Sequence, residues 1–493
     1  METEIKNSPI KGLNIKTNYA FSLIYKLIAV LVPILVTPYL ARVLEPDGNG
    51  VISFVSSIAS YFILLANLGI EDYGQRTAAI YRNDKEFLNK FVMEIFILKL
   101  FLSLLSGTLF IIIFSIIGGA NTGLYLIFSL SIFFVVFDFS WLFQGLENFR
   151  ILAITHIIAR AFYIVLVFVL VKEKEHVKIA AFLWVVMTVS SYVLSFLFVL
   201  KFFRIKKSVK LKPFSHVKEC IVYFIPAIAI SIYTILDKTM IGLITGSDFE
   251  NGYYEESDKI IKLLLTAIIS LNIIMRSRIS YCYAQGEYEK VKNYIRQTAN
   301  VAFMLAFPMT LGIIAVSEPF IYIYLGENYG KSILLLRILS PLIIIIATSN
   351  ILGTHYYTPF NKQRTSNKFL ITGAVVNFFC NIPLIYFFNS VGAAIASVFA
   401  EIVVLVLYAV FANDFFRFAE FIKVCWKYAL SAVIMFVAVW FIVKFLPQGI
   451  LYLAIEVLSG VVIYGLLLLI LRTEFVFALL KTLINKIKKG KKD

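Results

Sequence analysis

The chain has 493 residues, of which 60% are hydrophobic and only 15% are charged, and its mean hydropathy is +0.86. Soluble domains are about 45–50% apolar, so this composition excludes a soluble protein and indicates a polytopic membrane protein. The net charge of +16 is explained by orientation in the bilayer and by contact with anionic lipid. We therefore expect no nucleic-acid partner.

The predicted elements are long apolar stretches, each close to the roughly 20 residues that a helix needs to cross the bilayer. Charged residues, glycine and proline mark the breaks between them. In chain order the fourteen predicted spans are 17–41, 50–70, 91–117, 122–144, 150–171, 178–203, 218–245, 258–279, 298–317, 331–355, 368–388, 391–412, 424–446 and 449–471. The sequence thus predicts an all-α polytopic membrane protein with about fourteen transmembrane helices.

The loops predict the orientation of these spans. Lysine and arginine follow the even-numbered spans, among them Lys201, Arg204, Arg276, Arg278, Lys362 and Arg364, and the chain ends in KIKKGKKD. Loops after odd-numbered spans are short and mixed or acidic. Because basic loops stay in the cytoplasm, both termini are expected there, and the first span is expected to be retained rather than cleaved.

An internal repeat divides the predicted spans. The stretch FRILAITHIIARAFYIVLVFVLV from Phe149 resembles QRTSNKFLITGAVVNFFCNIPLIYFF from Gln363, and VKIAAFLW from Val177 resembles SVGAAIAS from Ser390, at an offset of about 213 residues. Six helices per repeat keep both copies in one orientation. We predict a cytoplasmic tail 1–17, six-helix lobes 18–212 and 213–415 around a central cavity, helices 13 and 14 within 416–471, and a basic cytoplasmic tail 472–493.

Polar side chains inside three spans predict which faces line the cavity, because polar groups are costly in lipid. Steps of three and four residues place them along one face of each helix. The stripe on the first span is Asn18, Ser22, Lys26, Ala29, Pro33 and Thr37. The seventh span carries Ser231, Thr234, Lys238, Gly242 and Thr245, bordered by Asp237, and the eighth carries Lys259, Lys262, Thr266 and Ser270.

The charges on these stripes predict an anionic cargo. Several lysines against the one aspartate of these stripes leave a surplus of positive charge, which requires an anion or solvent. Asp237 is expected to pair with Lys262 or Lys259 and to lock the two helices together, or else to contact the cargo. Lys238 is expected to face the cavity.

Other intramembrane charges leave alternatives open. Arg160 and Arg337 could face the cavity or a neighbouring helix. Glu401 is either a coupling site for a proton or cation or, as we prefer, the partner of a nearby base. Glu94 and Lys99 in the third span are expected to snorkel or to pair with each other.

No cofactor or metal site is expected. The four cysteines lack CxxC spacing, and the four histidines lie far apart in the sequence. A set of ligands at metal-binding spacing is therefore not visible.

Four stretches resemble one transporter family. They are NYAFSLIYKLIAVLVPILVTPYLARVLEPDGNGVISF from Asn18, LGIEDYGQRTAA from Leu68, DFSWLFQGLENFR from Asp138, and LDKTMIGLITG from Leu236 with the NGYYEESDKI that follows. Together they resemble the Wzx-type flippases of O-antigen or capsule repeat units, within the multidrug, oligosaccharidyl-lipid and polysaccharide exporter superfamily. The likeness extends over nearly the whole chain.

The resemblance implies alternating access of two six-helix bundles in the bacterial inner membrane. The cargo would be an undecaprenyl-diphosphate-linked oligosaccharide, moved to the outer leaflet for surface polysaccharide synthesis. Polysaccharide polymerase and assembly proteins would be partners, beside membrane lipid. The implied cavity cations are Lys26, Lys238, Lys259 and Lys262, with Arg76 at the cytoplasmic mouth, Arg42 at the outer mouth, and Asn18 and Tyr39 as sugar or headgroup contacts.

Three alternatives remain. A lipid II flippase also needs cavity cations, and two additional C-terminal helices would suit it. A drug or cation antiporter of the same superfamily would be expected to have an acidic cavity. A membrane glycosyltransferase or polysaccharide polymerase would need large outer loops and catalytic acids, whereas the longest predicted outer loop has about a dozen residues; an enzyme is therefore not expected.

Overall fold

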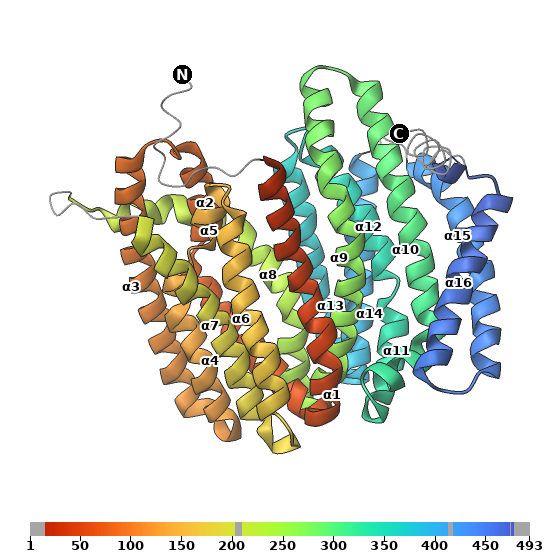
Figure 1. The fold of residues 1–493 in the computed structure, drawn as a ribbon, viewed down its shortest axis with the longest axis horizontal. Helices are drawn as coiled ribbons and strands as arrows, with labels where there is room; N and C mark the ends of the chain where they lie inside the picture. The colour runs from red at the N-terminus through yellow and green to blue at the C-terminus, as the bar shows by residue number, and fades with distance from the viewer. Residues whose placement is uncertain (1–14, 203–209, 413–417, 474, 478–493) are drawn as a thin grey trace, which may run out of the picture. The chain divides into compact units, whose positions relative to one another are not determined.

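The computed structural model describes residues 15–202, 210–412, 418–473 and 475–477, and at some helix positions only the backbone (Figure 1). The described residues form helices and contain no strand. They divide into two compact units, Met1–Gly252 and Tyr253–Asp493, and we describe each by itself. The predicted tails lie largely outside the described residues, and the predicted division into lobes after residue 212 remains a prediction.

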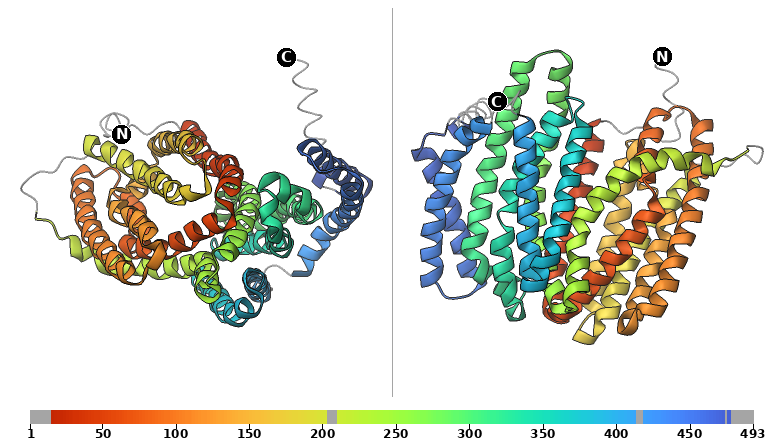
Figure 2. Two further views of the ribbon diagram at one scale, coloured as in Figure 1. Left: turned by 90° about the horizontal axis from the view of Figure 1, so that it is seen from below. Right: turned by 180° about the vertical axis from the view of Figure 1, so that it is seen from behind.

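In its described residues the first unit contains eight α-helices and the beginning of a ninth (Figure 2). They are α1 (Ile15–Asn67), α2 (Ile70–Ile80), α3 (Lys85–Ile117), α4 (Thr122–Phe134), α5 (Ser140–Gly145), α6 (Phe149–Leu170), α7 (Val177–Phe202), α8 (Val217–Thr245) and α9 (Asp248–Ala284), which continues into the second unit.

The second unit is built from the remaining helices. They are α10 (Tyr288–Tyr324), α11 (Gly330–Leu339), α12 (Leu342–Leu352), α13 (Gln363–Phe388), α14 (Ser390–Phe411), α15 (Phe418–Phe445) and α16 (Ile450–Ile470). Helix α13 packs on α14, and α10 packs on α15, which in turn contacts α16. A hydrogen bond of 2.7 Å between Ser366 and Tyr408 joins α13 to α14.

The fourteen predicted spans lie largely within described helices, although their ends differ and the first two share α1. The fourth span is divided into α4 and α5, and the tenth into α11 and α12. Eleven helical stretches of the described chain are long and apolar enough to cross a membrane. The all-α polytopic membrane fold is confirmed, while the number fourteen remains a prediction.

Helix α1 consists of two helices joined by a sharp break. A continuous helix of its 53 residues would be about 80 Å long at roughly 1.5 Å per residue, more than twice the thickness of the hydrocarbon layer. Glu45 has a φ of 58° and a ψ of 178°, and Pro46 follows it. Because a residue before proline disfavours the helical conformation, the sequence places the break at this position.

The break in α1 is fixed by its surroundings. Lys174, in the connection between α6 and α7, lies 2.6 Å from a Glu45 carboxylate oxygen and 3.1 Å from one of Asp47. A Cβ on Gly50 would lie only 1.7 Å from the backbone oxygen of Asp248 in α9. Two backbones therefore touch where α1 turns and α9 begins, and only glycine permits this approach.

The two charges of α3 do not pair with each other. Glu94 lies 2.9 Å from His216 Nε2 and accepts a 2.7 Å hydrogen bond from the backbone N–H of Lys212. Lys99 is 1% exposed and donates a 3.0 Å hydrogen bond to the backbone oxygen of Asp138. The expectation that they snorkel or pair with each other is therefore wrong. Each has a partner about 40 or more residues away, which satisfies a charge buried inside the protein.

Candidate substrate site

The two predicted cavity lysines of α9 have carboxylate partners on their own helix. Lys259 Nζ lies 2.8 Å from Glu256 and 3.2 Å from Glu255, and Lys262 Nζ lies 2.6 Å from Asp258. These partners are three or four residues earlier, the spacing at which side chains meet on a helix. All three acids are buried, whereas Lys259 is half-buried and Lys262 exposed.

This arrangement changes the charge argument. The eighth span is predicted to begin at residue 258, because only apolar residues identify a span. The helix begins ten residues earlier, at Asp248, and therefore includes acids that had been assigned to an outer loop. Between Glu255 and Lys262 the chain carries three carboxylates and two ammonium groups. The surplus of positive charge predicted for this helix is absent from this segment.

Helix α8 uses part of its predicted polar stripe to pack against α1. Gly242 faces Phe54, whose ring would lie 2.2 Å from an added Cβ. Beside the stripe, the hydroxyls of Thr239 and Ser57 lie 2.8 Å apart. Lys238, the residue directly before Thr239, is half-buried. Its role in contacting cargo remains a prediction.

Asp237 is buried, with 9% of its surface exposed. Its carboxylate interacts electrostatically with the hydroxyl of Tyr61 in α1. Both residues belong to the first unit. The predicted pairing with Lys259 or Lys262 would join the two units and remains a prediction.

The candidates on α1 have different surroundings. Asn18 is half-buried and Arg42 is exposed, while the side chain of Lys26 lies outside the described part of the structure. Tyr39 donates a 2.6 Å hydrogen bond to the backbone oxygen of Val171 at the end of α6, and its ring lies 4.5 Å from that of Phe168. This hydroxyl thus joins α1 to α6.

We expect replacement of Tyr39 by phenylalanine to lower the free energy of unfolding by about 1 kcal/mol, the net value of one hydrogen bond. Thermal unfolding of the purified protein in detergent measures this loss. Tyr386→Phe provides the control, because Tyr386 is 73% exposed. Unchanged stability with loss of surface polysaccharide would contradict a packing role and support a headgroup contact.

The remaining candidate charges lie at helix contacts or near aromatic rings. Arg337 donates a 2.7 Å hydrogen bond to Ser317, which joins α11 to α10. Arg160 interacts electrostatically with Tyr25, and among the described residues its buried Nη1 has no hydrogen-bond partner. Glu401 is buried on α14. Their roles toward cargo remain predictions.

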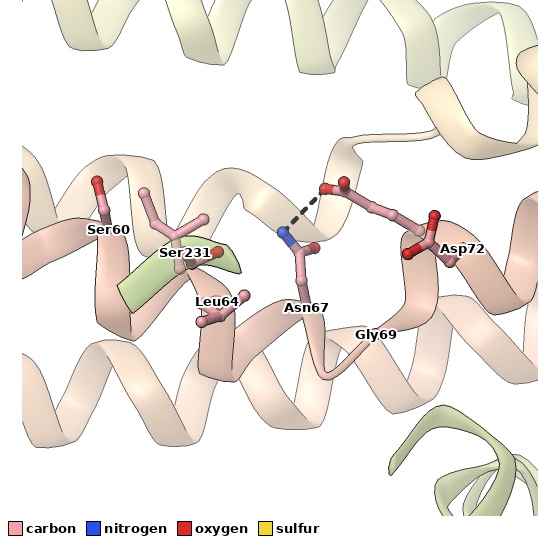
Figure 3. Close-up of a pocket in the computed structure, with 8 residues that line it drawn as sticks. Ser60, Leu64, Asn67, Gly69, Asp72 and Ser231 are labelled. Carbon is pink, nitrogen blue, oxygen red and sulfur yellow. Dashed lines mark hydrogen bonds between the residues drawn. The ribbon is translucent and has the colours of Figure 1, made fainter. Parts of the chain in front are cut away.

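A pocket of about 200 Å³ lies in the first unit, and we call it the α1–α2 pocket (Figure 3). Helices α1 and α2, the turn between them and α8 supply its lining residues: Ser60, Ile63, Leu64, Asn67, Gly69, Glu71, Asp72 and Ser231. Asn67 donates a 3.1 Å hydrogen bond to Glu71. The pocket therefore combines two carboxylates, an amide and two hydroxyls with a short apolar wall.

The turn between α1 and α2 positions this pocket. Leu68 and Gly69 both have positive φ angles, 42° and 73°. A Cβ on Gly69 would lie 2.5 Å from the backbone oxygen of Cys220 in α8, so glycine allows the turn to approach α8. The turn also places Glu71 and Asp72 in the first turn of α2, where the helix dipole favours negative charge.

Arg76 lies one turn further along α2. It is exposed, and its guanidinium donates a hydrogen bond to the hydroxyl of Tyr223 in α8. Arg76 is among the site residues predicted from the sequence, whereas Glu71 and Asp72 beside it are not. A signal was present, since two adjacent acids follow a glycine directly after an apolar span.

Comparison with known proteins identifies the family. A family model described as "Polysaccharide biosynthesis protein" matches residues 15–275, more than half of the chain. The chain belongs to the polysaccharide biosynthesis protein family. A second model, MatE, matches residues 223–391. Both matches agree with the predicted resemblance to Wzx-type flippases of the exporter superfamily, which is confirmed.

Members with curated names share low sequence identity with this chain. A candidate O-antigen transporter of Shigella dysenteriae is 24% identical over 388 residues, covering 76% of this chain and 94% of that protein. A candidate low-salt glycan biosynthesis flippase of Haloferax volcanii, Agl15, is 23% identical over 218 residues, covering 43% of this chain and 45% of that protein. These relatives are named as transporters or flippases.

A solved structure shares the fold. The lipid II flippase MurJ in an inward closed conformation aligns with a TM-score of 0.76 at 16% identity, covering 93% of this chain and 99% of that chain. At this identity the alignment shows the fold alone.

No group of three or more potential metal ligands occurs among the residues that the structure describes.

Proposed function

We propose that this protein is a flippase that carries polyprenyl-diphosphate-linked oligosaccharide from the cytoplasmic to the outer leaflet for surface polysaccharide synthesis. The observation that carries the proposal is the family match over residues 15–275. The name of the Shigella relative, an O-antigen transporter, supports it. We propose no catalytic step, since the cargo crosses the membrane unchanged.

The chemistry of such a cargo sets three requirements. Its diphosphate needs compensating cations in a water-accessible cavity, the role proposed for Lys26, Lys238, Lys259 and Lys262. Its sugars need hydrogen-bonding walls, and its polyprenyl chain can remain in the surrounding lipid. Alternating exposure of the cavity to the two sides then moves the polar headgroup without exposing it to hydrocarbon.

The proposal includes a location and partners. The protein would span the bacterial inner membrane with both termini in the cytoplasm, as the basic loops predict. A polysaccharide polymerase on the outer face would consume the translocated units. A lipid II flippase is the second candidate, because it would also need cavity cations and the two C-terminal helices α15 and α16 would suit it.

Deletion of the gene tests the proposal. We expect loss of surface polysaccharide and accumulation of complete lipid-linked repeat units that face the cytoplasm, detected by their inaccessibility to a membrane-impermeant sugar-oxidising reagent. Incomplete or unlinked sugars would instead indicate an enzyme. Arrest of cell-wall synthesis with accumulated lipid II would support the second candidate.

A further inference from the structure

We propose that the α1–α2 pocket binds a sugar ring of the cargo and leaves the diphosphate to cationic residues elsewhere. The inference rests on the proposed function and adds a subsite to it. By the predicted orientation, the pocket lies at the cytoplasmic end of the second span, where the cargo is loaded.

The size of the pocket suits one ring. Its volume of about 200 Å³ is below the roughly 300–1,000 Å³ of pockets that hold drug-sized ligands. It is several times the roughly 30 Å³ occupied by one water molecule. A single hexose fits between these limits.

The lining residues include both apolar and polar groups, as a sugar ring does. Ile63 and Leu64 offer an apolar wall for the C–H face of a pyranose, and Ser60 and Ser231 offer hydroxyls. Among the described residues, the buried Oδ1 of Asn67 has no hydrogen-bond partner, which leaves an unsatisfied acceptor on a residue that lines the pocket.

The charge of the pocket selects a hydroxyl-bearing group over a phosphate. The carboxylate groups of Glu71 and Asp72 can accept hydrogen bonds, and sugar hydroxyls donate them. Such charge-assisted bonds are about twice as strong as neutral ones. The same carboxylates repel a diphosphate. The buried ammonium of Lys99 interacts electrostatically with Glu71 and donates a hydrogen bond to the backbone oxygen of Asp138.

Binding of two lipids to the full-length protein in nanodiscs tests the proposal. The probes are the lipid-linked repeat unit extracted from the deletion strain and undecaprenyl diphosphate without sugar. We expect the variant Glu71→Gln/Asp72→Asn to raise the Kd for the repeat unit about tenfold, the loss from about one charged hydrogen bond. Its Kd for the bare lipid should stay unchanged or fall, because two negative charges are removed.

A second variant keeps both acids. Leu64→Phe fills part of the pocket and is expected to weaken binding of the repeat unit alone, which keeps the test valid if the double variant does not fold. Glu86→Gln is the matched control, since Glu86 is an exposed acid in the first turn of α3, and it should leave both Kd values unchanged.

The outcomes separate the pocket from the proposed function. Wild-type protein that binds neither lipid would refute the proposed function and the subsite with it. If the wild-type protein binds, but the variants weaken the binding of both lipids equally or of neither lipid, the subsite alone is refuted. Variants that change only the dependence of binding on sodium or pH would identify a cation site and also overturn the sugar assignment.

Discussion

Replacing Lys259 with glutamine is expected to abolish surface polysaccharide and to destabilise the protein. The change removes a proposed contact with the diphosphate and also the cation shared by Glu255 and Glu256. Glu256 is only 2% exposed. We expect a loss of about 2 kcal/mol in the free energy of unfolding, less than the roughly 3–5 kcal/mol of a fully buried pair, since the Lys259 side chain is 33% exposed.

A second substitution separates these two effects. In Lys259→Gln/Glu256→Gln the carboxylate nearest to the lost ammonium is removed as well, so stability should recover by more than half. If Lys259 binds the diphosphate, surface polysaccharide remains absent. Recovery of polysaccharide together with stability would show that Lys259 only neutralises Glu256, and it would remove Lys259 from the cavity. Thermal unfolding and electrophoresis of extracted polysaccharide provide the two measurements.

Another ion pair supplies the matched control. Lys290 lies 2.6 Å from Glu287 on an exposed surface, three residues apart, as Lys259 is from Glu256. Lys290→Gln should leave protein abundance and polysaccharide unchanged, because exposed pairs contribute little. The corresponding test on Lys262 pairs Lys262→Gln with Asp258→Asn.

Replacing Gly252 with alanine is expected to remove most folded protein from the membrane. A Cβ at this position would lie 1.9 Å from the backbone oxygen of Pro46, and a backbone atom cannot swing aside as a side chain can. Helix α9 and the break in α1 would have to separate, which we expect to cost about 3 kcal/mol or more, the upper range for overpacking. Size-exclusion chromatography of detergent extracts measures the folded fraction.

Gly465 on α16 provides the comparison for this substitution. An added Cβ there meets nothing within 4 Å, so Gly465→Ala should leave the folded fraction unchanged or slightly higher, since alanine favours a helix by roughly 0.5–1 kcal/mol. A folded fraction of Gly252→Ala equal to that of Gly465→Ala would contradict the close backbone contact.

The helical fold could be predicted from the sequence because each span has its own apolar stretch. The break in α1 could also be located, since Pro46 and charged Glu45 and Asp47 interrupt that pattern. The beginning of α9 could not be predicted from the sequence. The helix starts in polar residues, and a low hydropathy indicates a loop rather than a membrane span. Those residues supply the partners of Lys259 and Lys262.

Contacts between distant segments account for the other differences. Glu94 and His216 are 122 residues apart, and the sequence offers no pattern that joins them. The α1–α2 pocket likewise depends on Ser231 of α8 beside Asn67 of α1. Fixed steps along one helix identify a shared face, but they cannot show which other helix covers that face.

The contact between Gly50 and Asp248 also has a consequence for biogenesis. The two positions are about 200 residues apart in the chain, and synthesis proceeds at roughly 5–20 residues per second, so about 10–40 s pass between them. During this time Gly50, in the turn between the first two spans, lacks the backbone of Asp248 that covers it in the folded protein. An insertase or chaperone that shields this turn would therefore act early, before the ribosome has produced the segment that closes it.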